Sequence, residues 1–181
     1  AGLGGGSSNA ACTINMIDKL YKLNLSIEEK RKIALKFGTD IIYCLENNPA
    51  LVFGVGEKIQ KLNLNKRYNV LLINPKINVS TKEVYSLYDN NNEYSVEESK
   101  KELENKNITE LLYNDLEKVV FEKYQQIKKI EEELLLYSNN ILMSGSGSTV
   151  YVIDSKKVLK KILKEYKQKN PLYIYVLTKT R

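Results

Sequence analysis

Histidine and tryptophan are absent from this chain of 181 residues, and cysteine occurs only twice, at Cys12 and Cys44. The absence of histidine excludes Ser-His-Asp and Cys-His catalytic sites and the usual zinc sites. A general base must therefore be the side chain of an Asp, Glu, Lys or Tyr residue. The two cysteines are most simply free, buried thiols of a protein in a reducing compartment, and a disulfide between them stays open as the alternative.

Arginine and long apolar runs are also scarce. Only three of the 28 basic residues are arginine, although the net charge is +6. Lysine is a strongly hydrated point charge that is poorly suited to the bidentate contacts of nucleic-acid recognition. We therefore expect a solvated, lysine-rich surface rather than a nucleic-acid interface. Apolar runs such as residues 70–73 and 134–136 are far shorter than a membrane-spanning helix.

Glycine is sparse too, yet four of its nine residues lie among the first six positions of the chain. Two serines and an asparagine follow, and apolar residues then recur at helical spacing from Ala10 to Ile17. This pattern predicts a glycine loop that leads into a helix over about residues 9–23, with Ser7 or Ser8 as its cap.

Such a loop is suited to binding phosphate, because glycine backbone N–H groups and the unpaired N–H groups at a helix start can both point toward an anion. A flexible Gly/Ser linker would have the same composition, but it would not continue directly into an amphipathic helix. No Lys follows the last glycine, as a Walker A loop requires, and Ser7 stands where a dinucleotide-binding motif needs a glycine. Phosphate would therefore be held mainly by backbone and hydroxyl groups.

Asp40 is a lone carboxylate ahead of the apolar run 41–45. One interpretation is that Asp40 caps the start of a short helix. The other is that its carboxylate lies against an apolar wall, where it can act as a general base toward a hydroxyl group. The two interpretations are compatible.

Capping and turn residues mark further short elements in the first part of the chain. Ser26 and Glu29 form a capping box for a helix that ends at Gly38, and Phe37 is expected on its inward face. The segment Gly54-Val55-Gly56-Glu57 is a tight turn between two strands rather than a second phosphate loop.

A change in composition at residues 63–66 predicts a domain boundary, with one domain at residues 1–65 and another at 66–181. A polar, Asn-rich insertion is expected at about residues 89–107, followed by a helical region over about 109–135. Four strands with helices between them predict an α+β fold with a split-βαβ layer in the second domain. These strands are expected at residues 68–74, 141–143, 149–153 and 172–178.

Six segments, in their order along the chain, resemble the motifs of a known family. The first, residues 1–11, closely resembles the ATP-binding motif of the GHMP small-molecule kinases. Within this family the segments are most similar to the kinases of 4-diphosphocytidyl-2-C-methyl-D-erythritol in the non-mevalonate isoprenoid pathway. Each segment alone would be a weak signal, but their shared order makes chance a poor explanation. The other five are Gly38-Thr39-Asp40-Ile41, Gly54-Val55-Gly56-Glu57, Thr81 with Tyr85, Asn114-Asp115-Leu116-Glu117, and residues 143–149.

The resemblance implies the GHMP kinase fold. Residues 1–65 would be the second part of the N-terminal, ribosomal protein S5 domain 2-like domain, and residues 66–181 a ferredoxin-like split-βαβ C-terminal domain. The implied reaction is transfer of the ATP γ-phosphoryl group, with Mg²⁺, to the 2-hydroxyl group of the cytidyl substrate. The expected protein is a monomer or homodimer without nucleic-acid or membrane partners, in the bacterial cytoplasm or a plastid.

The resemblance also implies roles for individual residues. Asp40 would be the catalytic carboxylate beside the substrate hydroxyl, and Ser7 or Ser8 would lie near the Mg²⁺. Within the second glycine loop, residues 144–148, the part from Gly145 to Ser148 would support the first loop. Tyr85 could stack on the cytosine ring. The ATP-binding residues would be Gly2, Leu3, Gly4, Gly5, Gly6, Ser7, Ser8 and Asn9, and the substrate-binding residues Thr81, Tyr85, Gly145, Ser146 and Gly147.

The chain departs from the family pattern at several places. Ile42 and Gln125 stand where the family has proline, and the Asn-rich insertion is longer than expected. The family's ATP motif also follows strands that carry a catalytic Lys, whereas here the motif opens the sequence. We therefore expect an N-terminally truncated chain that is inactive by itself. Two alternatives stay open: another GHMP kinase, for homoserine, mevalonate or a sugar, and a noncatalytic basic α/β module that binds RNA.

Overall fold

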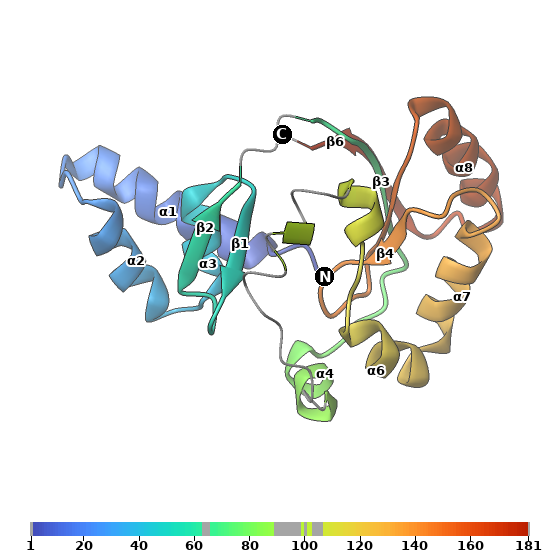
Figure 1. Ribbon diagram of the computed structural model, residues 1–181, viewed down its shortest axis with the longest axis horizontal. Coiled ribbons are helices and arrows are strands. Elements are labelled where there is room, and N and C mark those ends of the chain that lie inside the picture. Colours follow the sequence, from blue (N-terminus) through green and yellow to red (C-terminus); the bar gives the residue numbers. More distant parts are fainter. Residues whose placement is uncertain (1, 63–65, 89–98, 100, 103–106, 181) are drawn as a thin grey trace. The chain divides into compact units, whose positions relative to one another are not determined.

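In the computed structural model the chain divides at Lys66 into two units (Figure 1). The first unit is Gly4–Lys66, and the second combines Arg67–Arg181 with Ala1–Leu3. The structure describes residues 2–62, 66–88, 99, 101, 102 and 107–180. Most of the insertion predicted at about 89–107 therefore lies outside the described residues.

The described residues of the first unit form three helices and a two-stranded hairpin. Helix α2 begins with the predicted capping box, because the Ser26 hydroxyl accepts the Glu29 N–H at 3.2 Å and the Glu29 carboxylate accepts the Ser26 N–H at 2.8 Å. The small core of this unit is formed by Ala11, Ala34, Ile41 and Ile42. Its elements are α1 (Gly5–Tyr21), α2 (Ile27–Leu35), α3 (Asp40–Glu46), β1 (Ala50–Phe53) and β2 (Lys58–Lys61), with β1 and β2 antiparallel.

Helix α1 begins four residues earlier than the sequence pattern predicted. Gly4 is its N-cap, in the left-handed conformation with φ 60°, and no side chain caps the helix. The predicted caps, Ser7 and Ser8, lie instead within the first turn. Glycine tolerates the left-handed conformation without a steric cost, so Gly4 can precede the helix without a capping side chain. The apolar face is only partly covered by the described residues, since Leu20 is 74% exposed. Phe37, which was expected to point inward, is 78% exposed.

The second unit is built on a four-stranded antiparallel sheet in the order β4-β5-β3-β6. Along the chain, helices lie between β3 and β4 and between β5 and β6, and the described residues between β4 and β5 contain no helix. This is the predicted ferredoxin-like arrangement of an α+β fold. Helices α7 and α8 pack on the sheet (Figure 1). The elements are β3 (Asn69–Asn74), α4 (Thr81–Leu87), η1 (Ile108–Leu111), α6 (Leu116–Lys123), α7 (Gln125–Leu134), β4 (Ile141–Met143), β5 (Val150–Ile153), α8 (Lys156–Lys169) and β6 (Ile174–Lys179).

The core of the second unit lies between this sheet and its helices. Leu71 of β3 pairs with Val152 of β5 and with Leu177 of β6, and both Leu71 and Val152 are fully buried. Alternate residues of a strand share one face, so β3 sends Ile73 to the same side. The helices contribute apolar residues spaced three or four apart, which is the spacing of one helical face. These residues are Ile127, Ile130 and Leu134 of α7, and Leu159, Ile162 and Tyr166 of α8.

The helical region predicted over about 109–135 is divided in the structure. A 3-10 turn comes first, α6 follows, and the chain leaves helical geometry at Tyr124 before α7 begins at Gln125. The two cysteines are free, and Cys12 is exposed rather than buried as expected. No helix in the described part of the chain combines the length and apolar character needed to cross a membrane.

Candidate active site

The first glycine loop leaves the start of α1 open to an anion. An ideal Cβ atom at Gly4, Gly5 or Gly6 would meet no atom within 4 Å, so the described residues leave free space around this turn. The first turn carries no acidic side chain, and the Ser8 N–H donates to the Gly4 carbonyl at 2.9 Å. The N–H groups that precede Ser8 and the positive end of the helix dipole are therefore suited to a phosphate group.

The second glycine loop, residues 144–148, is a tight connection between β4 and β5. Ser144 N–H donates to the Thr149 carbonyl at 2.8 Å, and Gly147 N–H donates to the Ser144 carbonyl at 3.0 Å. The hydroxyl group of Ser148 is buried and donates to the Ile77 carbonyl at 2.7 Å. The loop is thus fixed at both ends and along its buried side.

Gly2 contacts this second loop directly. The Ser144 hydroxyl donates to the Gly2 carbonyl at 2.6 Å. Gly2 has φ 78°, and a Cβ atom there would collide with the Ser144 carbonyl oxygen and lie 2.9 Å from that of Gly147. Only glycine fits at this position, because any side chain would meet backbone atoms and adopt a strained conformation. The start of the first loop is therefore held by the second.

Two predicted substrate residues also meet at the second loop. The Thr81 and Ser146 hydroxyl oxygens are 2.9 Å apart, with Thr81 exposed at the start of α4 and Ser146 buried. Tyr85 is one turn further along α4 and is 61% exposed, so its ring is available for stacking. Within the second unit the structure thus brings together Gly2, the loop and the start of α4.

Asp40 belongs to the first unit and is the first residue of α3. The N-cap position is taken by Thr39, so the interpretation of Asp40 as the cap is wrong by one residue. Its side chain is exposed, whereas Ile41 and Ile42 behind it are 5% and 2% exposed. Cys44 lies one turn along α3, where burial and the negative charge of Asp40 raise the pKa of its thiol.

The β1–β2 turn supports the start of α3. Gly56 has φ 103°, and a Cβ atom there would lie 2.9 Å from the Cβ atom of Thr39, the neighbour of Asp40. Glu57 closes the turn by accepting the Val55 N–H at 2.7 Å. Hydrogen bonds from two backbone N–H groups, that of Glu57 first and that of Val55 second, lower the pKa of the Glu57 carboxyl group.

Sequence reasoning assigned no role to Asn114 or Glu117, although both belong to a segment that it singled out. The Asn114 side-chain amide donates to the carbonyl groups of Met143 and Gly145 at 2.9 and 2.8 Å. Glu117 accepts the Met143 N–H at 2.7 Å. The signal in the sequence was the pairing of a polar Asn and Glu three residues apart at a helix start, which places both side chains on one face.

Comparison with known proteins identifies the family of this chain. Residues 1–54 match the family described as GHMP kinases N terminal domain, and residues 96–172 match GHMP kinases C terminal. The chain belongs to the GHMP kinases. Kinases of this family use ATP.

Among the curated relatives, one from Thermoanaerobacter pseudethanolicus is named 4-diphosphocytidyl-2-C-methyl-D-erythritol kinase. It is 43% identical over 183 residues, which covers 97% of this chain and 62% of the relative. The chain thus spans less than two thirds of the length of that relative. A relative from Caldanaerobacter subterraneus has the same kinase name and is 37% identical, covering 97% of this chain and 63% of the relative. Both organisms are bacteria, whereas a plastid location stays a prediction.

Two solved kinase structures share the fold. A crystal structure of 4-(cytidine 5'-diphospho)-2C-methyl-D-erythritol kinase matches with a TM-score of 0.77 at 24% identity, covering 100% of this chain and 67% of that chain. A homoserine kinase from Cytophaga hutchinsonii matches with a TM-score of 0.73 at 15% identity, covering 100% and 66%. Because the two scores are close, the fold by itself does not distinguish the phosphate acceptor.

Proposed function

We propose that this chain is part of a kinase that transfers the γ-phosphoryl group of ATP to the 2-hydroxyl group of 4-diphosphocytidyl-2-C-methyl-D-erythritol. The observation that carries the proposal is the 43% identity, over 97% of the chain, to a protein of that name. Two features of the structure support the proposal: the open helix start at Gly4–Gly6, which is suited to a phosphate group, and the second glycine loop, which is hydrogen-bonded to Gly2.

The phosphate groups of ATP would be bound by the first glycine loop. The N–H groups of Gly5, Gly6 and Ser7 and the dipole of α1 offer partial positive charge without a lysine in the loop. A phosphoryl transfer asks for little covalent chemistry from the protein, so positioning and electrostatic stabilisation supply most of the rate enhancement.

A magnesium ion would be held mainly by the phosphate groups. The described residues contain no group of three or more His, Cys, Asp or Glu side chains that could form an all-protein metal site. The hydroxyl groups of Ser7 and Ser8 in the first turn of α1 fit a site of this kind, since Mg²⁺ prefers oxygen ligands and commonly uses few from the protein. The ion would neutralise charge on the transferred group.

Asp40 would orient or deprotonate the acceptor hydroxyl group. Its carboxylate is exposed at the start of α3, on a backbone fixed by the buried side chains of Ile41 and Ile42. On the second unit, Thr81 and the second glycine loop would contact the acceptor, and the exposed ring of Tyr85 would stack on its cytosine.

The test uses the protein in its full encoded length with ATP, Mg²⁺ and the cytidyl substrate. We expect phosphorylation of the substrate, and a fall in kcat of about 10²- to 10⁴-fold in Asp40→Asn because a general base is lost. Asp154→Asn is the matched control, since the Asp154 oxygen accepts the neighbouring Ser155 N–H, which an asparagine oxygen can also accept. Phosphorylation that is equally fast in Asp40→Asn would refute the role of Asp40.

A homoserine kinase is the second candidate, because the fold matches a homoserine kinase nearly as well. The two activities differ in whether the acceptor site must accommodate a cytosine ring. We expect CDP to compete with the acceptor in the cytidyl kinase, whereas a homoserine kinase would be insensitive to CDP at the acceptor site. Turnover of homoserine without competition by CDP would replace the first proposal with the second.

A further inference from the structure

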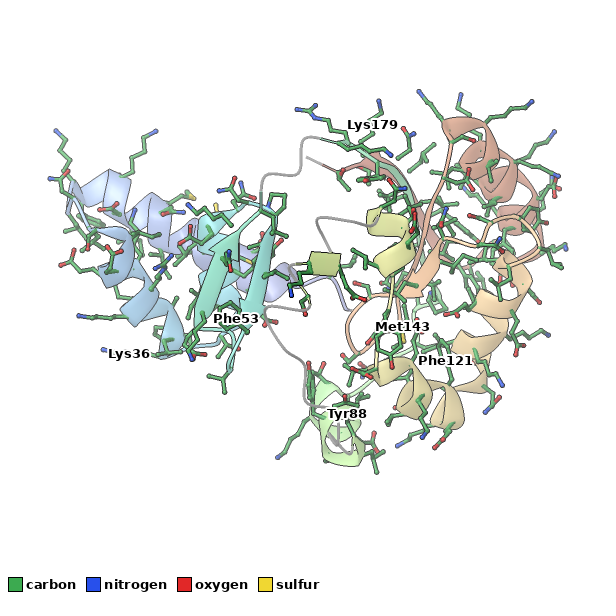
Figure 2. The ribbon with its side chains drawn as sticks, in the orientation of Figure 1. Lys36, Phe53, Tyr88, Phe121, Met143 and Lys179 are labelled. Carbon is green, nitrogen blue, oxygen red and sulfur yellow. The ribbon has the colours of Figure 1, made fainter. Side chains whose placement is uncertain are left out.

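The start of α6 holds the last residue of β4 from both sides. Glu117 accepts the Met143 N–H at 2.7 Å, and the Asn114 amide donates to the Met143 carbonyl at 2.9 Å. The same amide reaches the Gly145 carbonyl at 2.8 Å, inside the second glycine loop. The Asn114 oxygen accepts the Leu116 N–H at 3.0 Å, so the amide is fixed in orientation. Figure 2 shows Met143 at the end of β4, beside the helix that carries Phe121.

The contacts around Met143 continue into the second glycine loop and to Gly2. Met143 is fully buried, and a Cβ atom on Gly147 would lie 2.8 Å from the Met143 sulfur, so the loop folds back closely on this side chain. The next residue, Ser144, donates its hydroxyl group to the Gly2 carbonyl. A displacement of α6 relative to β4 would therefore also displace residues of the second glycine loop and Gly2 of the first.

The Glu131 carboxyl group on α7 lies beside that of Glu117, and each group affects the pKa of the other. A hydrogen bond between two carboxyl groups requires one proton between them. The Oε2 atom of Glu131 is buried and has no hydrogen-bond partner among the described residues. An ionised Glu131 would thus place negative charge on an unpaired buried oxygen beside another carboxylate, which disfavours the ionised form.

The surroundings of the pair favour retention of that proton. Burial raises the pKa of Glu117, and burial together with the charge of Glu117 raises the pKa of Glu131 to about 7. The facing groups are Glu132 on α7, whose charge acts in the same direction, and Tyr151 on β5, whose phenol pKa is raised by burial and by the charge of Glu117. Strand β4 contributes the Met143 N–H, and no described cation contributes to either carboxyl group.

We propose that Asn114, Glu117 and Glu131 form a brace that positions the second glycine loop for the phosphoryl transfer, with one proton shared by the two carboxyl groups. These are positioning residues, because they act on the substrates only through the loop. The inference rests on the proposed function in one respect, namely that the loop borders the substrates. Loss of the shared proton makes both carboxyl groups negative, and their repulsion separates α6 from α7 and loosens the grip on Met143.

The first experiment follows hydrogen exchange at the Met143 amide and does not depend on kinase activity. In the wild-type protein we expect the protection factor of this amide to fall about tenfold between pH 6 and pH 8.5, relative to amides of β3. Glu131→Gln should remove this dependence, because an amide donates the hydrogen bond to Glu117 at every pH. Glu117→Gln provides the same test from the other side if Glu131→Gln folds poorly. Glu122→Gln, an exposed change on α6, should behave as wild type.

The second experiment measures kcat and KM in the full-length protein across the same pH range. Above neutral pH, we expect the wild-type KM for ATP or for the acceptor to be at least fivefold higher than that of Glu131→Gln. The kcat values of the two proteins should stay within twofold of each other. Asn114→Asp, which removes both N–H donors, should raise KM at every pH. A ratio of wild-type to Glu131→Gln KM values that is flat with pH, or an unchanged KM in Asn114→Asp, would overturn the brace.

The two experiments separate the inference from the proposed function. Absence of kinase activity in the wild-type protein would refute the proposed function, yet the exchange measurement would still test the shared proton. Activity with a pH-independent protection factor at Met143 would refute the brace and leave the kinase assignment intact.

Discussion

Gly56 illustrates how a single backbone position supports the candidate site. It lies in the β1–β2 turn with φ 103°, and a Cβ atom there would be 2.9 Å from that of Thr39, next to Asp40. The sequence marked this glycine as a turn residue, and the contact with Thr39 adds a second reason for it. Both the left-handed conformation and the close approach require the absence of a side chain.

We expect Gly56→Ala to destabilise the protein by about 1–3 kcal/mol, through backbone strain and displacement of Thr39. Gly38→Ala is the control, because a Cβ atom at Gly38 would meet only the flexible Ile41 side chain, at 3.7 and 3.9 Å. Urea unfolding curves measure both changes, and kcat reports any displacement of Asp40. Equal stability of the two variants would contradict this account.

At the scale of elements, a buried carboxylate joins three parts of the first unit. Glu46 ends α3 with a side chain that is 3% exposed, and it is paired with Arg31 of α2 and with Lys61 of β2, the latter at 2.9 Å. Burial would raise the pKa of Glu46, but the hydrogen bonds from Lys61 and Arg31 outweigh it and lower the pKa. The same helix begins with Asp40, so the cluster also fixes the element that carries the catalytic candidate.

Because the folded-state pKa of Glu46 is lowered, its stabilisation is present above the ordinary value of 4.5 and is lost as the pH falls through the folded pKa. We expect Glu46→Gln to cost about 1–3 kcal/mol at pH 7 and progressively less as the pH falls and the wild-type carboxylate becomes protonated. Thermal unfolding against pH measures this difference. The control is Glu132→Gln on α7, because the ion pair of Glu132 with Lys128 is exposed. A loss of stability in this control as large as that in Glu46→Gln would refute the argument.

The break between α6 and α7 explains how glutamine fits at the position where the resemblance to the family implies a proline. Gln125 is the first residue of α7, a position where proline is common because its missing N–H would be unpaired anyway. In this chain the Gln125 amide donates to the Phe121 and Glu122 carbonyls at 2.7 and 3.2 Å, which satisfies groups at the end of α6.

We expect Gln125→Pro to change the free energy of unfolding by less than about 1 kcal/mol, since reduced freedom of the unfolded chain offsets the lost side-chain bonds. Lys129→Pro, inside the same helix and exposed, should cost about 3 kcal/mol or more. Circular dichroism during urea unfolding compares the two. A similar loss in both variants would show that Gln125 does not occupy a helix start.

At the scale of the whole molecule, the two units bury very different apolar cores. Four buried apolar residues form the core cluster of the first unit, whereas sixteen form that of the second, counted over the described residues. Stability rises with buried apolar area, so the two units should differ in local stability.

Hydrogen exchange measures this difference directly. We expect amides of β3, β5, α7 and α8 to exchange at least tenfold more slowly than those of α1, α2 and α3. Peptides from both units in denaturant serve as the reference for intrinsic rates. A single exchange rate across both units would mean that they unfold as one cooperative body.

The local signals in the sequence account for much of the fold. The Ser26–Glu29 capping box, the strand at Ala50–Phe53 and the four strands of the second unit were predictable, because capping and alternation act between close neighbours in the chain. The start of α1 was placed four residues too late because a glycine cap leaves no capping side chain to detect. The site residues themselves stay predictions.

The order of the motifs along the chain was enough to establish the GHMP kinase family and the α+β fold. Which of these motifs are in contact became clear from the folded structure. It places Gly2 against the 144–148 loop, Thr81 against Ser146, and the start of α6 against Met143. These contacts join residues 26 to 142 positions apart, and no local pattern in the sequence records a hydrogen bond over such a separation.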